Sequence, residues 1–320
     1  MRVKLWGTQG SLPSPIDEAQ VRRKLRDALL SATGVDLSNP DAVDAYIDSL
    51  PFHVRGTYGG NTPCVEIRNS RDDLLIIDAG SGIRALGGEL LKREFGKGLG
   101  TAHLLMSHFH WDHMQGFTFF TPAYIKGNHI TLWGSARGGL REAFERQQSS
   151  PFFPVGLDIM ESTLEFRDLL DVLEPYNGRF RVLAHQLDHP GGCHSFRIEA
   201  DGKSFVYASD GEYKRGDAKS LQPYLDFFCD ADVLLFDAQF SVVESLFEKR
   251  DWGHSAAPMG VEIACAAGVK KLVLFHHDPR SEDAFITKIL EDAIAYAEHI
   301  PHKGRVEILA AHDGMELDLE

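Results

Sequence analysis

Short apolar runs recur along the whole chain, and each has the length and composition of a buried β-strand. They cover residues 3–6, 64–67, 74–77, 103–106, 130–133, 180–183, 196–198, 205–207, 233–236, 272–275 and 306–309. Asp201-Gly202 lies between two of these runs and has the composition of a type I′ turn, which predicts a β-hairpin there. We therefore expect strands from one end of the chain to the other.

Helical patterns are interleaved with these strands. Residues 281–300 place apolar side chains near helical spacing, and residues 258–267 form a further helical segment that ends at Gly268. Ser255 is predicted to cap the start of that segment. Strands and helices that alternate in this way favour a layered α/β sandwich over separate α and β domains.

Residues 15–54 interrupt the alternation and predict a helical insertion within an early hairpin. Ser14-Pro15 has the sequence of an N-cap followed by proline at the first helical position, and Asn39-Pro40 repeats this signal. The plainer interpretation is that the insertion simply packs on the main body. A lid over the site, or a contact in a homodimer, is the alternative.

Composition and charge exclude several classes of protein. The 320 residues are 43% hydrophobic and 25% charged, and no apolar stretch reaches the ~18 residues of a membrane span. The 47 acidic and 33 basic residues give a net charge of −14, which repels long polyanions and disfavours a groove for long nucleic acid. The four cysteines form no closely spaced pair, which favours reduced thiols. We expect one domain over residues 1–320, a cytoplasmic location and no membrane partner.

The densest candidate site is the run His-Phe-His-Trp-Asp-His at residues 108–113. It directly follows the apolar run 104–106, so a buried strand ends where three imidazoles and a carboxylate begin. Side chains on the loop after a strand can converge on one point, as a divalent cation requires. A solvated histidine-rich loop is the alternative, and it is disfavoured because the rest of the chain supplies further ligand-type residues.

Four further residues of the same chemistry stand at or just after the ends of predicted strands: Asp78, His189, Asp210 and His276. Each of them, taken alone, is as readily structural as functional. Imidazole and carboxylate ligands without thiolate suit zinc, manganese or iron, and a histidine-rich set favours zinc. The sequence therefore predicts a site for two divalent metal ions, with zinc favoured and manganese or iron as alternatives.

Together, and in this order, these residues resemble the metallo-β-lactamase superfamily over most of the chain outside the insertion. The resemblance implies a four-layer αββα sandwich with the metals at one edge of the two sheets. It implies that His108, His110 and His189 bind the first metal, that Asp112, His113 and His276 bind the second, and that Asp210 bridges them. The choice of His276 over its neighbour His277 rests on the family pattern. Asp78 and Asp188 are expected to support imidazole ligands from behind.

The phosphodiester-cleaving members of that superfamily are the most similar. Gly253-His254-Ser255 resembles the Gly-His-Ser motif of the tRNA 3′-processing endonucleases (tRNase Z), which implies that His254 protonates the leaving oxygen. Asp237 stands where those enzymes carry a glutamate that orients the histidine, and Asp112 would orient a metal-bridging hydroxide. The expected catalytic residues are therefore Asp112, His254 and Asp237. A place beside a helix N-terminus, without chemistry, is the alternative for His254.

Two departures from tRNase Z indicate a smaller substrate. Only 21 positions separate His189 from Asp210 (210 − 189), which leaves no room for the flexible arm that grips tRNA in those enzymes. Residues 80–83, Gly-Ser-Gly-Ile, replace their usual Gly-Glu-Gly-Thr. The chain is more similar to small bacterial cyclic phosphodiesterases, which implies hydrolysis of a cyclic nucleotide, a cyclic sugar phosphate or a short oligonucleotide. Thioester or acyl hydrolysis, and a tRNase Z-like ribonuclease activity, are the alternatives.

Two loops are candidates for substrate contact. Residues 150–154 place two phenylalanines between prolines, which suits stacking on a base, although plain apolar packing is the simpler interpretation. Residues 58–63 form a turn that the resemblance places near the site. That turn would either make polar contacts with the substrate or serve only as a tight turn.

Overall fold

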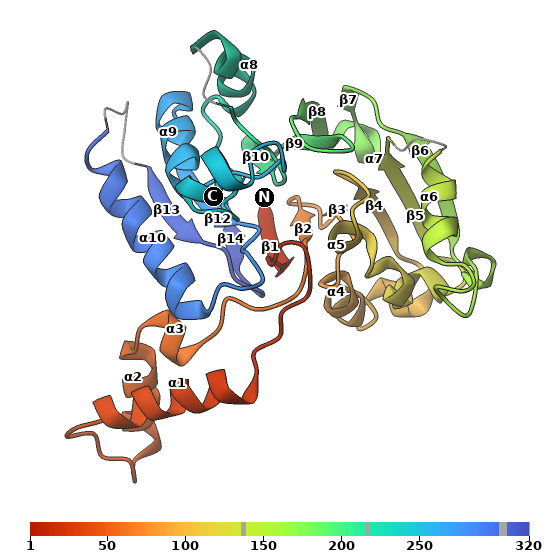
Figure 1. Ribbon diagram of the computed structural model, residues 1–320. Helices are drawn as coiled ribbons and strands as arrows, with labels where there is room; N and C mark the ends of the chain where they lie inside the picture. The colour runs from red at the N-terminus through yellow and green to blue at the C-terminus, as the bar shows by residue number, and fades with distance from the viewer. Residues whose placement is uncertain (136–138, 215–217, 301–305, 320) are drawn as a thin grey trace.

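Two mixed β-sheets pack face to face in the computed structural model, and helices cover the outer face of each sheet (Figure 1). The structure describes residues 1–135, 139–214, 218–300 and 306–319. Within these ranges each sheet has seven strands. The four layers confirm the expected αββα sandwich.

The first sheet has the strand order β14-β1-β2-β3-β4-β5-β6. Its strands are β1 (Arg2–Gly7), β2 (Cys64–Arg68), β3 (Leu74–Ile77), β4 (Thr101–Leu105), β5 (His129–Gly134), β6 (Thr163–Asp168) and β14 (Glu316–Asp318). The second sheet has the order β13-β12-β11-β10-β9-β8-β7. Its strands are β7 (Val172–Leu173), β8 (Arg181–Leu187), β9 (Cys193–Ala200), β10 (Lys203–Ala208), β11 (Val233–Asp237), β12 (Lys271–Phe275) and β13 (Glu307–Ala310). Every predicted strand run overlaps one of these strands.

Helices form the outer layers and the insertion. The α-helices are α1 (Glu18–Ser31), α2 (Pro40–Ser49), α3 (Phe52–Arg55), α4 (Ile83–Leu90), α5 (Trp111–Met114), α6 (Leu140–Gln147), α7 (Pro175–Gly178), α8 (Ala218–Phe228), α9 (Ala257–Ala267) and α10 (Asp283–Ala297). Short 3-10 helices are η1 (Glu94–Lys97), η2 (Phe117–Phe119), η3 (Thr121–Tyr124) and η4 (Leu157–Ile159), and η5 (Glu244–Glu248) is a π-helical turn. Helices α8, α9 and α10 cover the second sheet, whereas α4 and α6 cover the first (Figure 1). Among the described residues, no helix has both the length and the apolar composition needed to cross a membrane.

The strand directions bring several candidate residues to one edge of the sandwich. Strands β3 to β6 run parallel in the first sheet, and strands β10 to β13 run parallel in the second. The carboxyl ends of parallel strands meet on one side of a sheet, where the following loops form a natural site. Asp78 follows β3, Asp210 follows β10 and His276 follows β12, so all three are delivered to such an edge.

Apolar side chains on the facing surfaces hold the two sheets together. The core between them contains fully buried residues from both sheets, including Leu5 and Ile77 from the first and Phe196 and Phe275 from the second. Along β1, buried and more exposed side chains alternate, which is the period of two expected for a strand with one face in the core. This alternation fixes the register of the strands that deliver the site residues.

The predicted hairpin and the predicted end of α9 are confirmed. Asp201 and Gly202 have φ angles of 54° and 71°, the left-handed pair that a type I′ turn requires between β9 and β10. Gly268 ends α9 with a φ of 76°. The predicted cap is wrong, because Ala256 occupies the N-cap position and Ser255 Oγ donates instead to the Gly211 carbonyl oxygen at 2.6 Å.

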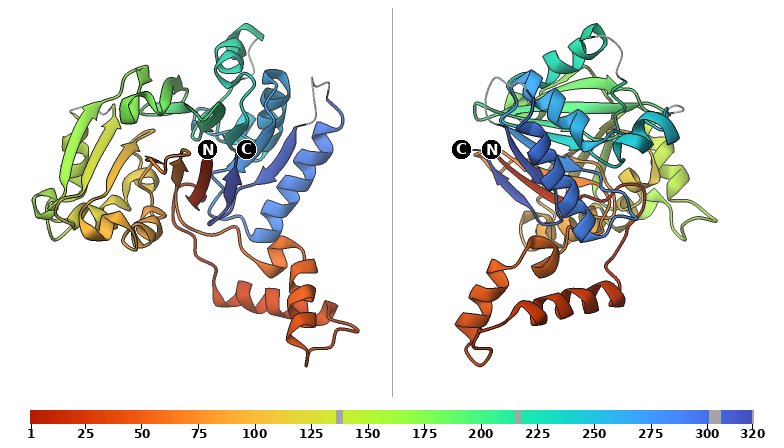
Figure 2. Two further views of the ribbon diagram at one scale, coloured as in Figure 1. Left: turned by 180° about the vertical axis from the view of Figure 1, so that it is seen from behind. Right: turned by 60° about the vertical axis from the view of Figure 1, so that its left-hand side comes forward.

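The insertion between β1 and β2 is helical, as predicted, and projects from the body as an arm (Figures 1 and 2). The predicted start of its first helix is wrong, because Asp17 caps α1 in a capping box with Gln20. Ser14 Oγ instead donates to the Pro279 carbonyl oxygen at 2.9 Å and ties the base of the arm to the body. Asn39 caps α2, which begins with proline as predicted.

Helix α1 lies against the body without burying any of its own residues. Polar contacts hold this helix in place. Lys24 Nζ lies 2.6 Å from Asp283 Oδ2, and Arg23 Nη2 lies 2.7 Å from Glu282 Oε1 at the start of α10. The apolar stripe of α1 is therefore left facing solvent.

Candidate metal centre

Three histidines meet on the more open side of the site. His108 and His110 stand on the loop after β4, and His189 stands on the loop after β8. His189 Nε2 lies 3.0 Å from His110 Nδ1, and the ring centroids of His108 and His189 are 4.9 Å apart. One nitrogen from each residue lies within 4.8 Å of the other two, as the ligands of a shared cation do.

A second group lies deeper, and all four of its members are buried: Asp112, His113, Asp210 and His276. His276 Nε2 lies 3.2 Å from Asp112 Oδ2 and 3.3 Å from His113 Nε2. The four ligand-type atoms all lie within 4.8 Å of one another. The loop after β4 and helix α5 thus supply residues to both groups.

Asp210 faces both groups with different oxygen atoms. Its Oδ2 lies 3.7 Å from His108 Nε2 and 3.9 Å from His189 Nε2. Its Oδ1 lies 3.2 Å from His113 Nε2 and 3.3 Å from His276 Nε2. This is the arrangement that a carboxylate needs in order to bridge two cations.

Asp78, Asp210 and His276 share a strained backbone conformation. Their φ angles are 60°, 55° and 61°, in the left-handed region that residues other than glycine seldom adopt. Such conformations cost on the order of 1–3 kcal/mol and are concentrated at functional sites. Each marks the sharp turn at a strand end that places the side chain in the site.

The donor set fits two divalent cations. His108 Nε2 is buried and has no hydrogen-bond partner among the described residues, a costly state unless a ligand satisfies it. Burial lowers the pKa of His108, His110 and His189, so these imidazoles are neutral and can each offer a lone pair. Burial raises the pKa of Asp210, but the charges of His276 and His113 outweigh it and hold that pKa well below its usual value. The roles of these residues as metal ligands stay a prediction, which their geometry supports.

Of the two adjacent histidines, only His276 reaches the deeper group. His277 Nε2 donates instead to the carbonyl oxygen of Ala311, the residue after β13, at 2.8 Å. Burial lowers the pKa of His277 to about 4, so this ring stays neutral in its backbone contact. The geometry therefore agrees with the choice of His276.

Asp78 supports the deeper group from behind. Its Oδ2 accepts hydrogen bonds at 2.7 Å from His113 Nδ1, from Ser107 Oγ and from Tyr207 Oη, and its Oδ1 accepts from the Ser107 amide at 2.7 Å. Because His113 donates through Nδ1, its Nε2 is left to bind a cation. Asp188, the other expected support, instead pairs with Lys214 at 2.8 Å near the surface, so that expectation is wrong.

Tyr207 was not singled out by the sequence, because its run 205–207 reads as an ordinary buried strand. We expect Tyr207→Phe to weaken metal binding by about 10- to 100-fold, since it removes one of the bonds that fix Asp78. Competition with a chromophoric chelator would measure the change. Tyr213→Phe is the matched control, because the Tyr213 hydroxyl is buried without a partner among the described residues. Equal metal affinity in both variants would show that Tyr207 does not act through Asp78.

The Gly253-His254-Ser255 motif contacts both groups of candidate ligands, His189 of the first group and His276 of the second. The Gly253 carbonyl oxygen accepts from His189 Nδ1 at 2.9 Å, which leaves His189 Nε2 free to face the first group. A Cβ atom at Gly253 would lie only 2.2 Å from His189 Nδ1, and the φ of Gly253 is 82°, so the position requires glycine. Ser255 anchors the end of the motif through its bond to Gly211.

His254 is held by Asp237 rather than by a helix end. Its Nδ1 lies 2.7 Å from Asp237 Oδ2, and its ring stacks on the His276 ring with a centroid distance of 5.1 Å. Burial lowers the pKa of His254, but the charge of Asp237 outweighs this effect and raises the pKa to about 9. Asp237 is fully buried and also accepts from the Asp210 amide at 3.0 Å. The alternative of a neighbour to the α9 cap is not supported, because the side chain points to Asp237.

Asp112 has a partner that the sequence did not reveal. The amide nitrogen of Ser11 donates to Asp112 Oδ2 at 2.7 Å. Ser11 itself has a φ of 60°, and its Oγ accepts from Gln239 Nε2 at 2.8 Å. The segment that leads into the helical arm therefore fixes the carboxylate of Asp112.

Several cavities lie near the site, and one of about 180 Å³ is lined in part by His254 and Ser255. Another, of about 300 Å³, is bounded by His108 and His110 themselves, together with Phe109, Arg146 and Gly191. It lies directly against the first group of candidate ligands. The predicted base-stacking loop contributes no residue to the described lining of this cavity. In that loop Phe153 packs edge-on against Phe119 at 5.7 Å, in keeping with the plainer interpretation.

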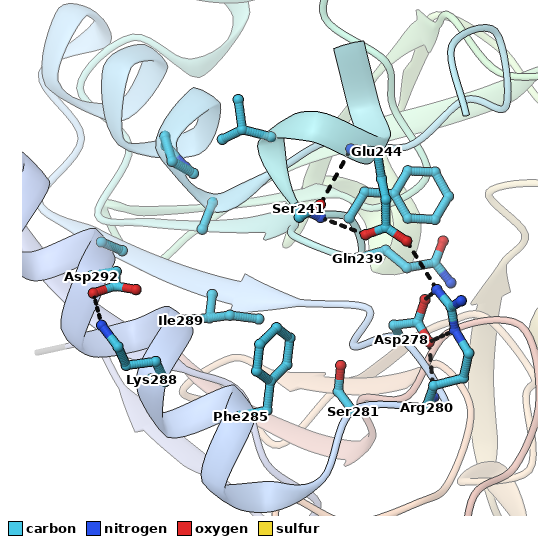
Figure 3. A pocket seen from close by; sticks show the side chains of 15 residues that line it. Gln239, Ser241, Glu244, Asp278, Arg280, Ser281, Phe285, Lys288, Ile289 and Asp292 are labelled. Atoms are coloured by element: carbon cyan, nitrogen blue, oxygen red, sulfur yellow. Dashed lines mark hydrogen bonds and ion pairs between the residues drawn. The ribbon is translucent and has the colours of Figure 1, made fainter. Parts of the chain in front are cut away.

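A larger cavity, of about 590 Å³, lies between α10 and the loop after β11 (Figure 3). Phe285 of α10 points into it, and Phe240 forms part of its wall. Its charged residues are paired with one another, as Arg280 and Asp278 are at 2.6 Å. The Phe240 ring meets the His254 ring with a centroid distance of 5.1 Å, so this cavity lies beside His254 without including the candidate ligands.

The turn at residues 58–63 acts as scaffolding in this structure. The Thr62 amide donates to Ser81 Oγ at 2.9 Å, while Thr62 Oγ1 accepts from the Ser81 amide at 2.8 Å. The amides of Gly60 and Asn61 donate to Asp313 Oδ2 at 3.2 and 3.1 Å. The bonds to Ser81 fix the loop after β3, which carries Asp78, and the bonds to Asp313 tie the turn to the segment between β13 and β14.

Comparisons of the sequence identify a family and several relatives. A family model described as "Beta-lactamase superfamily domain" matches residues 74–277. A ribonuclease Z from Thermoplasma volcanium is 33% identical over 121 residues, which are 37% of this chain and 33% of that protein. A ribonuclease Z from Methanosarcina acetivorans is 24% identical over 308 residues, covering 80% of this chain and 92% of that protein. The match thus spans about a third of the first relative and nearly all of the second.

Solved structures share the fold at low sequence identity. The metallo-β-lactamase fold protein YhfI from Bacillus subtilis has a TM-score of 0.61 at 17% identity, with 99% of each chain covered. The short form of human tRNase Z has a TM-score of 0.60 at 16% identity, with 100% of each chain covered. A diphosphatase from the PhnP family has a TM-score of 0.57 at 16% identity, covering 100% of this chain and 98% of that one. At these identities the similarity establishes the fold.

Proposed function

This chain belongs to the β-lactamase superfamily, in its metallo-β-lactamase fold, and from that premise we propose that it is a metal-dependent hydrolase of a small phosphodiester. The observation that carries the proposal is the pair of His254 and Asp237 beside the two groups of candidate ligands. An alkoxide is a poor leaving group, so a positioned imidazole that donates a proton lowers the barrier to phosphodiester cleavage.

The residues of the site would have three separate roles: metal binding, orientation of the nucleophile and proton donation. The two groups of histidines and aspartates would hold two divalent cations, which when bound supply a water-derived nucleophile at neutral pH and stabilise charge on the reacting oxygens. Asp112, fixed by the Ser11 amide, would orient that nucleophile. His254 would donate its proton from Nε2, because its Nδ1 is engaged by Asp237.

Acyl or thioester hydrolysis is the alternative chemistry. A thiolate leaves without needing a proton, so His254 and Asp237 would have no task in cleaving a thioester. The relatives named ribonuclease Z also favour a phosphodiester over a thioester. These two points support the phosphodiester.

A small substrate is favoured over tRNA. The segment between His189 and Asp210, all of it described, is taken up by the hairpin of β9 and β10 and carries no separate arm. The net charge of −14 opposes long polyanions. The cavity of about 300 Å³ beside His108 and His110 lies at the lower end of the range for small-molecule sites. We therefore expect a cyclic nucleotide, a cyclic sugar phosphate or a short oligonucleotide as substrate.

We expect the zinc-loaded protein to hydrolyse bis(p-nitrophenyl) phosphate, and to turn over a thioester and a β-lactam at least about tenfold more slowly, because two cations would stabilise both the attacking and the leaving oxygen of a phosphodiester. Release of p-nitrophenolate, thiol and opened lactam would be followed by absorbance, with manganese- and iron-loaded protein in parallel. A panel of cyclic mono- and dinucleotides would then identify the substrate. Turnover of the thioester alone would contradict the proposal.

A further inference from the structure

The chain has four tryptophans, and their surroundings divide them into two pairs. Trp6 and Trp133 belong to the scaffold, because the Nε1 atom of each donates a hydrogen bond to another side chain, at 2.8 and 3.0 Å. Trp111 and Trp252 are 76% and 60% exposed, and neither indole makes a hydrogen bond or a ring contact with a described residue. Indole rings contribute most to binding where they cover a partner, so this exposed pair is available for contact with a ligand.

Both exposed indoles stand beside the first group of candidate ligands. Trp111 directly follows His110, the exposed member of that group. Trp252 directly precedes Gly253, whose carbonyl oxygen accepts from His189 Nδ1 at 2.9 Å. The two segments come from different sheets, since one follows β4 and the other follows β11. His189 connects them, because its Nε2 lies 3.0 Å from His110 Nδ1.

We propose that Trp111 and Trp252 each stack on one base of a phosphodiester that joins two nucleosides. An indole stacks on the flat face of any nucleobase, and this contact requires no charge on the protein. The inference rests on the proposed phosphodiester hydrolysis and narrows its substrate, because a cyclic sugar phosphate carries no base and a cyclic mononucleotide carries one.

The charges around the site favour stacking as the source of affinity for the nucleosides. Lys214 lies 2.8 Å from each of two carboxylates, and Arg146 lies 2.6 Å from one. Of the basic residues that line the cavities beside His110 and His254, only Arg250 has no ion pair among the described residues. With a net charge of −14 for the chain, contacts that need no positive charge must bind the parts of the substrate away from the metals.

Neither indole contributes to the described walls of those two cavities, so both stand at the rim of the site. The nucleosides of such a substrate would emerge there, on either side of the phosphorus atom. Trp252 lies two residues before His254, the proposed acid, and is assigned to the base of the leaving nucleoside. Trp111 directly precedes Asp112, which would orient the nucleophile, and is assigned to the other base.

Binding of an uncleavable analogue tests this inference without any hydrolysis. The zinc-loaded protein would be titrated by calorimetry with a diadenosine phosphonate in which a methylene group replaces the leaving oxygen. Trp111→Ala and Trp252→Ala should each weaken binding by about 5- to 150-fold, the loss of one stacked base, and phenylalanine at either position should restore most of it. The same analogue without its bases should bind equally to the wild type and to every variant.

Equal affinity of the wild type for the analogues with and without bases would overturn the inference. Hydrolysis of bis(p-nitrophenyl) phosphate would in that case still support the proposed function, so the two failures are distinguishable. Phe285→Ala is the matched control and should bind as the wild type does, since Phe285 is 54% exposed in the cavity of about 590 Å³, away from the candidate ligands. A loss in this control equal to that at the two tryptophans would place a base in that cavity and also overturn the inference.

Analogues that carry only one of the two bases test the assignment of each indole. Trp252→Ala should lose affinity only for the analogue with its base on the leaving nucleoside, and Trp111→Ala only for the other analogue. If both variants lost affinity for the same analogue, the two indoles would hold a single base. That result would overturn the assignment to a substrate with two nucleosides.

Tryptophan fluorescence reports the contact between base and indole directly. The diadenosine analogue should quench the emission of the wild type. It should not quench the emission of the double variant Trp111→Ala, Trp252→Ala, because Trp6 and Trp133 are bonded within the scaffold. Unchanged metal content and thermal unfolding would show that the double variant is folded. Quenching that persists in it would overturn the inference.

Discussion

Asp210→Ala is expected to lose bound metal and hydrolytic activity together. Asp210 is the residue that faces both groups of candidate ligands, with Oδ2 toward His108 and His189 and Oδ1 toward His113 and His276. Removing it leaves a site of imidazoles with no shared anion to hold two cations at a short distance. Removing a partner outside the ligand set already costs 10- to 100-fold, so we expect a loss of activity greater than about 100-fold.

Elemental analysis of protein purified without added metal would measure the loss of bound metal, and an assay of the same preparation would measure the rate of hydrolysis. The wild type should contain close to two ions per chain, and the variant fewer than one. Asp188→Ala is the matched control, because Asp188 lies beside His189 in sequence but pairs with Lys214 at the surface. A variant at Asp210 that kept both ions would refute the bridging role.

His254→Ala is expected to lower kcat by ~10²–10⁴ while leaving the metal content unchanged, because it removes a general acid and no ligand. The loss should be large for an alkyl phosphodiester, whose leaving oxygen needs a proton. It should be small for bis(p-nitrophenyl) phosphate, whose p-nitrophenolate leaves readily as an anion. The two kcat ratios, measured on the same preparation, separate acid catalysis from other roles.

His129→Ala provides a control for loss of an imidazole, since His129 pairs with Glu165 at 3.0 Å at the surface, away from the site. Equal losses on good and poor leaving groups would make His254 a binding residue instead of an acid. Full activity in His254→Ala would remove the best support for phosphodiester cleavage, while leaving the metal centre itself untouched.

The strands that deliver the site were predictable because each is a short apolar run followed by a polar residue. Asp78, Asp210 and His276 all follow runs of this kind, and the parallel pairing of those strands brings their ends together. Strand β6 was missed because its sequence, Thr-Leu-Glu-Phe-Arg-Asp, is half charged and lies at the edge of its sheet. The strands β7 and β14 are only two and three residues long, too short for a pattern to appear.

Contacts between distant side chains could not be predicted from local patterns. Tyr207 and Asp78 are 129 positions apart, and Ser11 and Asp112 are 101 positions apart. Helix caps failed for a related reason, since several residues near a helix start can serve as the cap and tertiary contacts choose among them. Ser14 and Ser255 both have side chains suited to capping, but each is bonded to a backbone carbonyl of another segment.

The left-handed backbone at Asp78, Asp210 and His276 limits how far this enzyme could be engineered for thermal tolerance. Glycine would adopt the same φ without penalty, so each of these positions gives up folding stability that a featureless turn would keep. Because these side chains are candidate ligands or, at Asp78, support for one, we expect their exchange to dismantle the site, so a search for heat-resistant variants should gain nothing at these strand ends. Positions on the outer helical layers, where packing can change without moving the strand ends, offer the better targets.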